Sequence, residues 1–151
     1  MSLVIKELEQ LLERGNAHAS LEDAVKGISD KLAGKVPDGL PYNLWQLIEH
    51  IRITQWDILE FSRDPKHKSP DWPTGYWPKS KPGDLKKTVD QVIADRKTFI
   101  GLLREAGEGI YTPFPHGDGQ SLFREALLIA DHTSYHTGEI IVVRRLLGGW
   151  E

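Results

Sequence analysis

The sequence predicts an all-α protein built as a four-helix bundle, and three observations support this prediction. Apolar residues recur with helical spacing along four long stretches. No stretch alternates apolar and polar residues between turn signals, as a half-buried strand does. The chain of 151 residues suits one hydrophobic core, so we expect a single domain over residues 1–151.

The N-terminal part of the chain predicts one full helix and one short extra helix. A stripe of leucines marks a helix over residues 3–14, and Gly15 ends it. A short extra helix is predicted over residues 21–28, with Ser20 as its N-cap. Glycine and proline make residues 33–41 a loop.

Three further long helices follow. The second long helix is predicted from Pro41 or Tyr42 to Ser62, because proline suits the first turn of a helix. The third is predicted over residues 84–106, with Asp84 as N-cap. The fourth is predicted over residues 121–147, where two glycines stop it.

Two long irregular loops connect these helices, over residues 64–83 and 107–119. The first contains five prolines, which exclude a regular helix, together with two tryptophans and a tyrosine. A long loop that carries aromatic residues is more often packed on the protein than disordered. We therefore expect residues 64–83 to be ordered and to cover part of the bundle.

Composition excludes several classes of function. The formal charge of -3 and pI of about 6.1 give no basic surplus for nucleic acid or an anionic membrane surface. The absence of cysteine excludes disulfides, a cysteine nucleophile and thiolate metal ligands. The amphipathic, acid-containing start does not resemble a signal peptide, and no apolar run approaches a membrane span. We expect a cytoplasmic protein.

Three histidines fall on helix faces that should be buried. His132 and His136 are four residues apart within the apolar stripe of the last helix, and His50 lies in the wide apolar arc of the second long helix. A single buried histidine is usually satisfied by ordinary hydrogen bonds, and that reading stays open for each ring. Three together favour a divalent cation, which satisfies three imidazoles at once.

Several other residues are weaker candidates for the site. Glu139 lies one helical turn beyond His136 and is the candidate catalytic acid or base, although it could instead pair with Arg144. Glu125 projects to the same stripe and is a lesser candidate. His116 could reach the mouth of the bundle, but an exposed loop position is the favoured reading.

The chain resembles the DinB-like superfamily, the damage-inducible proteins and their thiol-transferase relatives, over essentially its whole length. The resemblance rests on LWQLIEHIRITQWDILEF in the second long helix, PFPHGDGQSLFREALL before the last helix, and DHTSYHTGEIIVVRRLLG within it. It implies an up-down-down-up four-helix bundle. It also implies a metal held by one histidine of the second long helix and two of the last, here His50, His132 and His136.

The resemblance also suggests functions. Relatives with known activity include S-transferases that use bacillithiol, mycothiol or glutathione, and a mycothiol-dependent maleylpyruvate isomerase. We therefore expect one zinc or nickel ion and thiol transfer to a small electrophile. The alternatives are a metal-dependent hydrolase on the same histidines and a non-enzymatic metal-binding or stress-response protein. The resemblance further implies a homodimer, for which Trp45 and Trp56 beside Arg52 offer a helix face.

Overall fold

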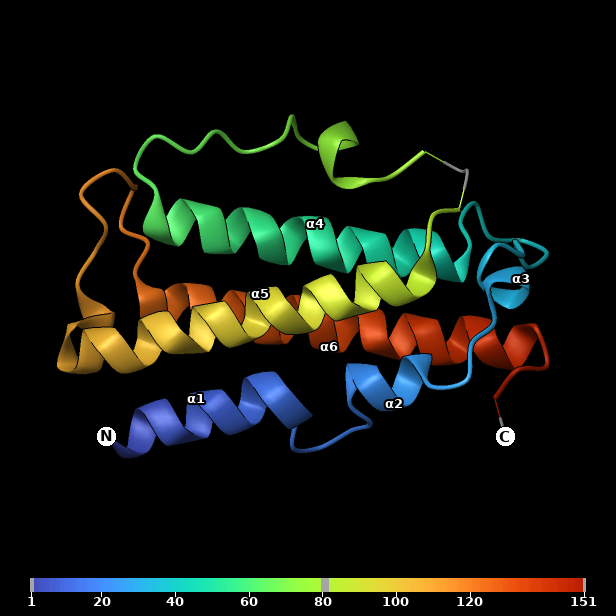
Figure 1. The fold of residues 1–151 in the computed structure, drawn as a ribbon, viewed down its shortest axis with the longest axis horizontal. Helices are drawn as coiled ribbons and strands as arrows, with labels where there is room; N and C mark the ends of the chain where they lie inside the picture. Colours follow the sequence, from blue (N-terminus) through green and yellow to red (C-terminus); the bar gives the residue numbers. More distant parts are fainter. Residues whose placement is uncertain (1, 80–81, 151) are drawn as a thin grey trace.

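The structure, a computed structural model, describes residues 2–79 and 82–150, and all regular secondary structure within them is helical (Figure 1). The all-α prediction is confirmed. The helices are α1 (Leu3–Arg14), α2 (Leu21–Val25), α3 (Asp30–Ala33), α4 (Leu44–Arg63), α5 (Leu85–Ala106) and α6 (Leu122–Leu146), with short 3-10 helices η1 (Thr74–Tyr76) and η2 (Gly107–Tyr111).

The long helices form a bundle in which α4 and α5 run in one direction and α1 and α6 in the other (Figure 1). Helices α1 and α2 follow each other along the same side of the bundle (Figure 1). Because α4 and α5 are parallel, the chain must return along the length of α4, which is roughly 30 Å for a helix of this size. The connection between α4 and α5 makes this return (Figure 1); residues 80 and 81 of the predicted 64–83 loop lie outside the described residues. Its length therefore follows from the topology.

Two predicted helix boundaries were wrong. Helix α4 begins at Leu44, after the predicted start at Pro41 or Tyr42, because Asn43 and Gln46 form a capping box. The Asn43 side chain accepts a hydrogen bond from the Gln46 main-chain N–H at 2.8 Å, and the Gln46 side chain accepts one in return at 3.1 Å.

Helix α2 is also shorter than predicted, ending at Val25 rather than at residue 28. Gly27 takes a positive φ of 75°, which a continuing helix cannot accommodate. The short helix α3, capped by the Ser29 side chain, was not predicted. The predicted cap of α2 is present, since Ser20 and Asp23 form a capping box.

The core consists of two apolar clusters separated along the bundle by a polar layer. On α4 one cluster reaches Ile51 and the other begins at Ile58. On α6 the buried members stop at Ile129 and resume at Ile140. The histidines of the last helix fall inside this gap. Burial of the apolar side chains in the two clusters stabilises the fold by about 25 cal/mol per Å² of apolar surface. This free energy offsets the cost of burying the polar side chains between the clusters.

The connection between α4 and α5 packs on the two tryptophans assigned to a dimer face. Trp45 is 8% exposed, and its ring lies against Gly83. Trp56 meets the ring of His67 edge to face, with centroids 5.3 Å apart. Trp45 is thus buried and Trp56 half-buried against segments of the same chain, which leaves less free surface than the predicted dimer face requires. Homodimer formation stays a prediction.

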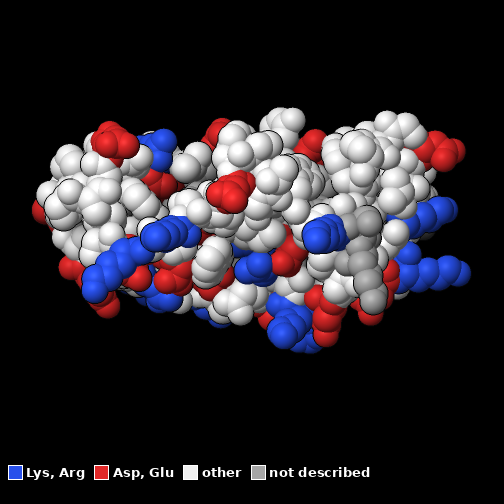
Figure 2. Space-filling model, turned by 90° about the horizontal axis from the view of Figure 1, so that it is seen from above, with Lys and Arg blue, Asp and Glu red and all other residues white. Residues whose placement is uncertain are grey.

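The outer surface carries charges of both signs. Figure 2 looks onto the face covered by the 64–83 connection, where acidic and basic side chains are scattered among uncharged ones without a continuous basic area. In the part of the chain that the structure describes, no helix combines the length and apolar character needed to cross a membrane.

Candidate metal site

Three imidazoles converge in the polar layer between α4 and α6. His50 comes from α4 and is 5% exposed; His136, 7% exposed, and the half-buried His132 come from α6. Each offers a ring nitrogen, and these atoms lie within 4.8 Å of one another. Two nitrogens that share one ion at about 2.1 Å can be no further apart than roughly 4.2 Å, so small side-chain movements suffice. The three residues could hold a metal ion, as the sequence predicts.

The ring of His50 is oriented by the main chain of the covering loop. Its Nδ1 lies 2.9 Å from the carbonyl oxygen of Tyr76, which can only accept, so Nδ1 carries the proton. The Nε2 lone pair then faces the Nε2 of His132 at 3.0 Å. Without a cation this contact is a hydrogen bond donated by His132. With a cation, both lone pairs can point at it.

Glu139 and Tyr42 orient the third ring. Nδ1 of His136 donates to Oε2 of Glu139 at 2.5 Å. The hydroxyl of Tyr42 donates to the other carboxylate oxygen at 3.1 Å. Glu139 therefore contacts the ring nitrogen that faces away from the histidine cluster and leaves Nε2 of His136 for a ligand. Carboxylates that hold metal-ligating histidines in this way fix the tautomer and raise ligand basicity.

Burial keeps two of the rings uncharged. Desolvation lowers the pKa of His50, although the Tyr76 carbonyl opposes this shift. Burial, reinforced by the neighbouring His136 and His50, lowers the pKa of His132 to about 3. At neutral pH both rings are neutral, the form in which imidazole binds a metal. Three neutral nitrogen ligands suit a divalent transition metal.

A cleft of about 610 Å³ opens beside the histidines, a volume typical of small-molecule sites. Trp77 forms one wall and stacks on His50, with ring centroids 4.2 Å apart and planes 3° from parallel. The 64–83 connection thus reaches the site through both the Tyr76 carbonyl and the Trp77 ring. Asp131, which is exposed, lies at the edge of the same cleft.

A buried carboxylate network beside the cleft was not predicted. Asp57 accepts hydrogen bonds from the Tyr76 hydroxyl at 2.6 Å and from Nε2 of His67 at 2.7 Å. Burial and the Asp57 carboxylate raise the pKa of Tyr76 to about 12, so its hydroxyl remains a donor. Asp57 lies two helical turns beyond His50 on α4, which places both residues on the same face of the helix. This spacing is the sequence signal that could have identified Asp57 as a neighbour of the site. The network fastens the covering loop to α4.

Two weaker candidates lie outside the histidine cluster. Glu125 is 2% exposed and pairs with Arg124 at 2.6 Å. His116 is half-buried rather than exposed, since its Nε2 donates to the main-chain carbonyl of Phe61 at 2.8 Å and its ring stacks on Phe114. That ring fixes the loop before α6 against the end of α4.

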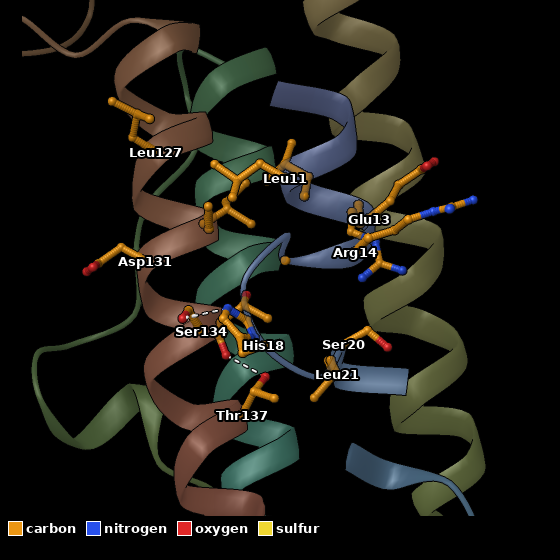
Figure 3. A pocket seen from close by; sticks show the side chains of 16 residues that line it. Leu11, Glu13, Arg14, His18, Ser20, Leu21, Leu127, Asp131, Ser134 and Thr137 are labelled. Atoms are coloured by element: carbon orange, nitrogen blue, oxygen red, sulfur yellow. Dashed lines mark hydrogen bonds between the residues drawn. The ribbon is translucent and has the colours of Figure 1, made fainter. Parts of the chain in front are cut away.

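A second cavity, of about 380 Å³, lies on another face of α6 (Figure 3). Polar and charged side chains line it, among them Asp131, which also lines the histidine cleft. The Ser134 hydroxyl lies 2.9 Å from Nε2 of His18. Because Nδ1 of His18 donates to the Ala19 carbonyl at 2.8 Å, Nε2 is the acceptor. Ser134 lies in the middle of α6. The histidine-lined cleft is the candidate functional site, because it offers three nitrogens that could bind a metal ion.

Comparison with protein families gives a match over most of the chain. The model described as DinB superfamily matches residues 15–140, which is well over half of the chain and includes all three histidines. Comparison with the curated proteins and with the solved structures gives no match.

Proposed function

Because the chain belongs to the DinB superfamily, we propose that it is a metal-dependent enzyme that transfers a small-molecule thiol to an electrophile. His50, His132 and His136 are the proposed ligands of one zinc or nickel ion. The observation that carries the proposal is the convergence of their ring nitrogens within 4.8 Å beside a cleft large enough for a substrate. A structural zinc site is usually closed by four protein ligands, whereas three ligands leave a position open.

The protein's own residues have distinct proposed roles. When bound, a divalent cation at this site supplies the positive charge that lowers the pKa of a thiol or of water. Tyr76 and Trp77 hold the ring of His50, and Glu139 holds that of His136. Both carboxylate oxygens of Glu139 already accept hydrogen bonds, so we assign it as a positioning residue instead of the catalytic acid or base that the sequence suggests.

The proposed reaction is a substitution at an electrophilic carbon. The thiol gives up its proton to solvent, and its sulfur forms a bond to that carbon. The leaving group departs with the electron pair of the broken bond. The cleft residues contribute by holding the electrophile close to the histidine cluster, since orientation alone can account for several kcal/mol of a barrier.

Hydrolysis on the same histidines is less well supported. Activation of water usually draws on a nearby base with a free acceptor. Asp57 is engaged by Tyr76 and His67, and Glu139 by His136 and Tyr42. A thiol needs less help than water, because its ordinary pKa lies much closer to neutrality. A non-enzymatic metal-binding role is disfavoured by the substrate-sized cleft beside the cluster.

The test is a turnover assay on zinc- and nickel-loaded protein. A chloronitrobenzene is offered together with bacillithiol, mycothiol, glutathione or cysteine, and the thioether is measured. Turnover that requires both the thiol and the metal, and that disappears in His132→Ala, supports the proposal. Cleavage of a nitrophenyl ester without thiol, in the absence of any thioether, contradicts thiol transfer and favours the hydrolase. Absence of both reactions favours a binding role.

A further inference from the structure

Aromatic side chains make up much of the lining of the histidine cleft. The 64–83 connection contributes Trp72, Tyr76 and Trp77, and α6 contributes Tyr135. Trp72 is 80% exposed and Tyr135 is 67% exposed. Large aromatic surfaces left in water are unfavourable, and several around one cleft indicate a contact surface for a ligand.

These rings come from two elements that form different parts of the cleft. Trp72 and Tyr76 meet edge to face, with centroids 5.6 Å apart, which sets one ring of the connection against the other. Tyr135 meets His136 edge to face at 4.9 Å and so extends the aromatic lining on α6 beside the histidine cluster. Rings from the connection and from α6 therefore line the same cleft, where a flat molecule can stack on them.

The charged residues of the cleft are acidic. Among the described residues that line it, the charged side chains are those of Asp57 and Asp131, and none is a lysine or an arginine. Asp57 is already satisfied by two donors, while Asp131 is exposed at the edge. Away from the three histidines, an anionic ligand would meet carboxylates and ring faces, both of which repel negative charge, whereas ring faces attract cations.

We propose that the electrophile taken by this cleft is a flat, aromatic molecule that carries no negative charge. That this ligand is an electrophile rests on the proposed function. The preference for a flat molecule without negative charge rests on the residues that line the cleft. The thiol partner is then recognised through its sulfur near the histidines, and any carboxylates that it carries must lie outside the lining.

The experiment measures ligand binding to metal-stripped protein by calorimetry, so that the preference is read without the cation. Three naphthalenes that differ only in their 2-substituent serve as probes: trimethylammoniomethyl, hydroxymethyl and carboxylate. We expect the cationic and neutral probes to bind at least tenfold more tightly than the anionic one. Binding of the carboxylate as tightly as the others overturns the inference, and so does the absence of binding by all three.

Two substitutions locate the effect. Asp131→Lys should reduce the preference for the cation over the anion at least fivefold, whereas Glu105→Lys, an exposed charge change on α5, should leave it unchanged. Trp72→Ala should weaken all three probes, whereas Tyr111→Ala, another exposed aromatic, should not. Equal effects of each variant and its control contradict the assignment to this cleft.

The outcomes separate this inference from the proposed function. If the probes bind in the expected order but the metal-loaded protein makes no thioether, thiol transfer is wrong and the ligand preference of the cleft stands. If the loaded protein transfers thiol to an anionic electrophile at least as fast as to its neutral analogue, the proposed function stands and this inference is wrong.

Discussion

The Nε2 atoms of His50 and His132 lie 3.0 Å apart, although 82 positions separate the two residues in the chain. The Tyr76 carbonyl fixes the proton of His50 on the opposite nitrogen, so the lone pair of His50 points at His132. Burial lowers the pKa of both rings, and neither ring is charged at neutral pH. Both rings are neutral, and binding of a cation requires that the Nε2 proton of His132 move to its Nδ1.

Glu139→Gln should weaken metal binding by about tenfold while leaving the stoichiometry at one ion per chain. The amide oxygen can still accept from His136, but the charge that raises the basicity of the ring is lost, and such partners are typically worth 10–100-fold in affinity. Competition titration against a chelator of known affinity measures the change. Tyr42→Phe, which removes only the hydroxyl that contacts Glu139, should have a smaller effect. Complete loss of the ion in Glu139→Gln would instead make Glu139 a metal ligand.

Tyr76→Phe should lower the free energy of unfolding by about 1–3 kcal/mol, because it removes a donor from the buried Asp57 carboxylate. Metal affinity should change less than threefold, since His50 is held by the main-chain carbonyl, which the substitution keeps. Urea denaturation measures the first quantity and metal titration the second. Tyr111→Phe is the control, because Tyr111 is 49% exposed and should change stability by less than about 0.5 kcal/mol. Equal losses in the two variants would mean that the Asp57 contact contributes nothing.

Two glycine substitutions should change stability in opposite directions. Gly15 has a φ of +63°, and an added Cβ would lie 2.6 Å from Cε1 of His18, so Gly15→Ala should cost at least about 1–2 kcal/mol. Gly138 lies within α6 with open space where a Cβ would be, so Gly138→Ala should add about 0.5–1 kcal/mol. Thermal unfolding of the metal-stripped proteins provides the comparison. A stabilised Gly15→Ala variant would show that the turn before His18 is not as described.

Asp95→Asn should stabilise the protein at neutral pH by about 1 kcal/mol. Oδ2 of Asp95 is buried without a hydrogen-bond partner, and burial raises the pKa of this carboxyl. The unfolded chain therefore releases the proton at a lower pH than the folded chain. Stability is lost as pH rises through the interval between the two pKa values, and the penalty persists at neutral pH.

The gain from Asp95→Asn should consequently shrink as the pH is lowered toward the ordinary pKa of aspartate. Urea denaturation near pH 7 and near pH 4 measures the trend. Asp90→Asn, an exposed change on the same helix, should show no comparable gain at neutral pH. A gain for Asp95→Asn that grows on acidification would contradict the assignment.

Periodicity predicted much of the fold and the histidine cluster, for a physical reason. A helix turns by about 100° per residue, so an apolar stripe reveals which polar residues share the buried face. His50, His132 and His136 were found in this way. The start of α4 was misplaced because Pro41 suits a first turn, whereas the capping box of Asn43 and Gln46 decides where the helix begins.

The irregular connection could not be derived in the same way. Residues 64–83 have no repeating geometry, so the sequence did not indicate that Tyr76 and His67 would meet Asp57 or that Trp77 would stack on His50. The contact between His18 and Ser134 was hidden for the same reason, because the turn that follows Gly15 places the His18 ring. Contacts that join a helix to a loop depend on the path of the loop in space.

The most direct test of the proposed metal site is a calorimetric titration of metal-stripped protein with zinc and with nickel. The wild-type protein and His18→Ala should each bind one ion per chain. His50→Ala, His132→Ala and His136→Ala should each lose at least 100-fold in affinity, because two imidazoles remain where three are needed. If any of these three variants keeps one ion per chain with the affinity of the wild-type protein, the histidines do not form the metal site and the proposed function loses its basis.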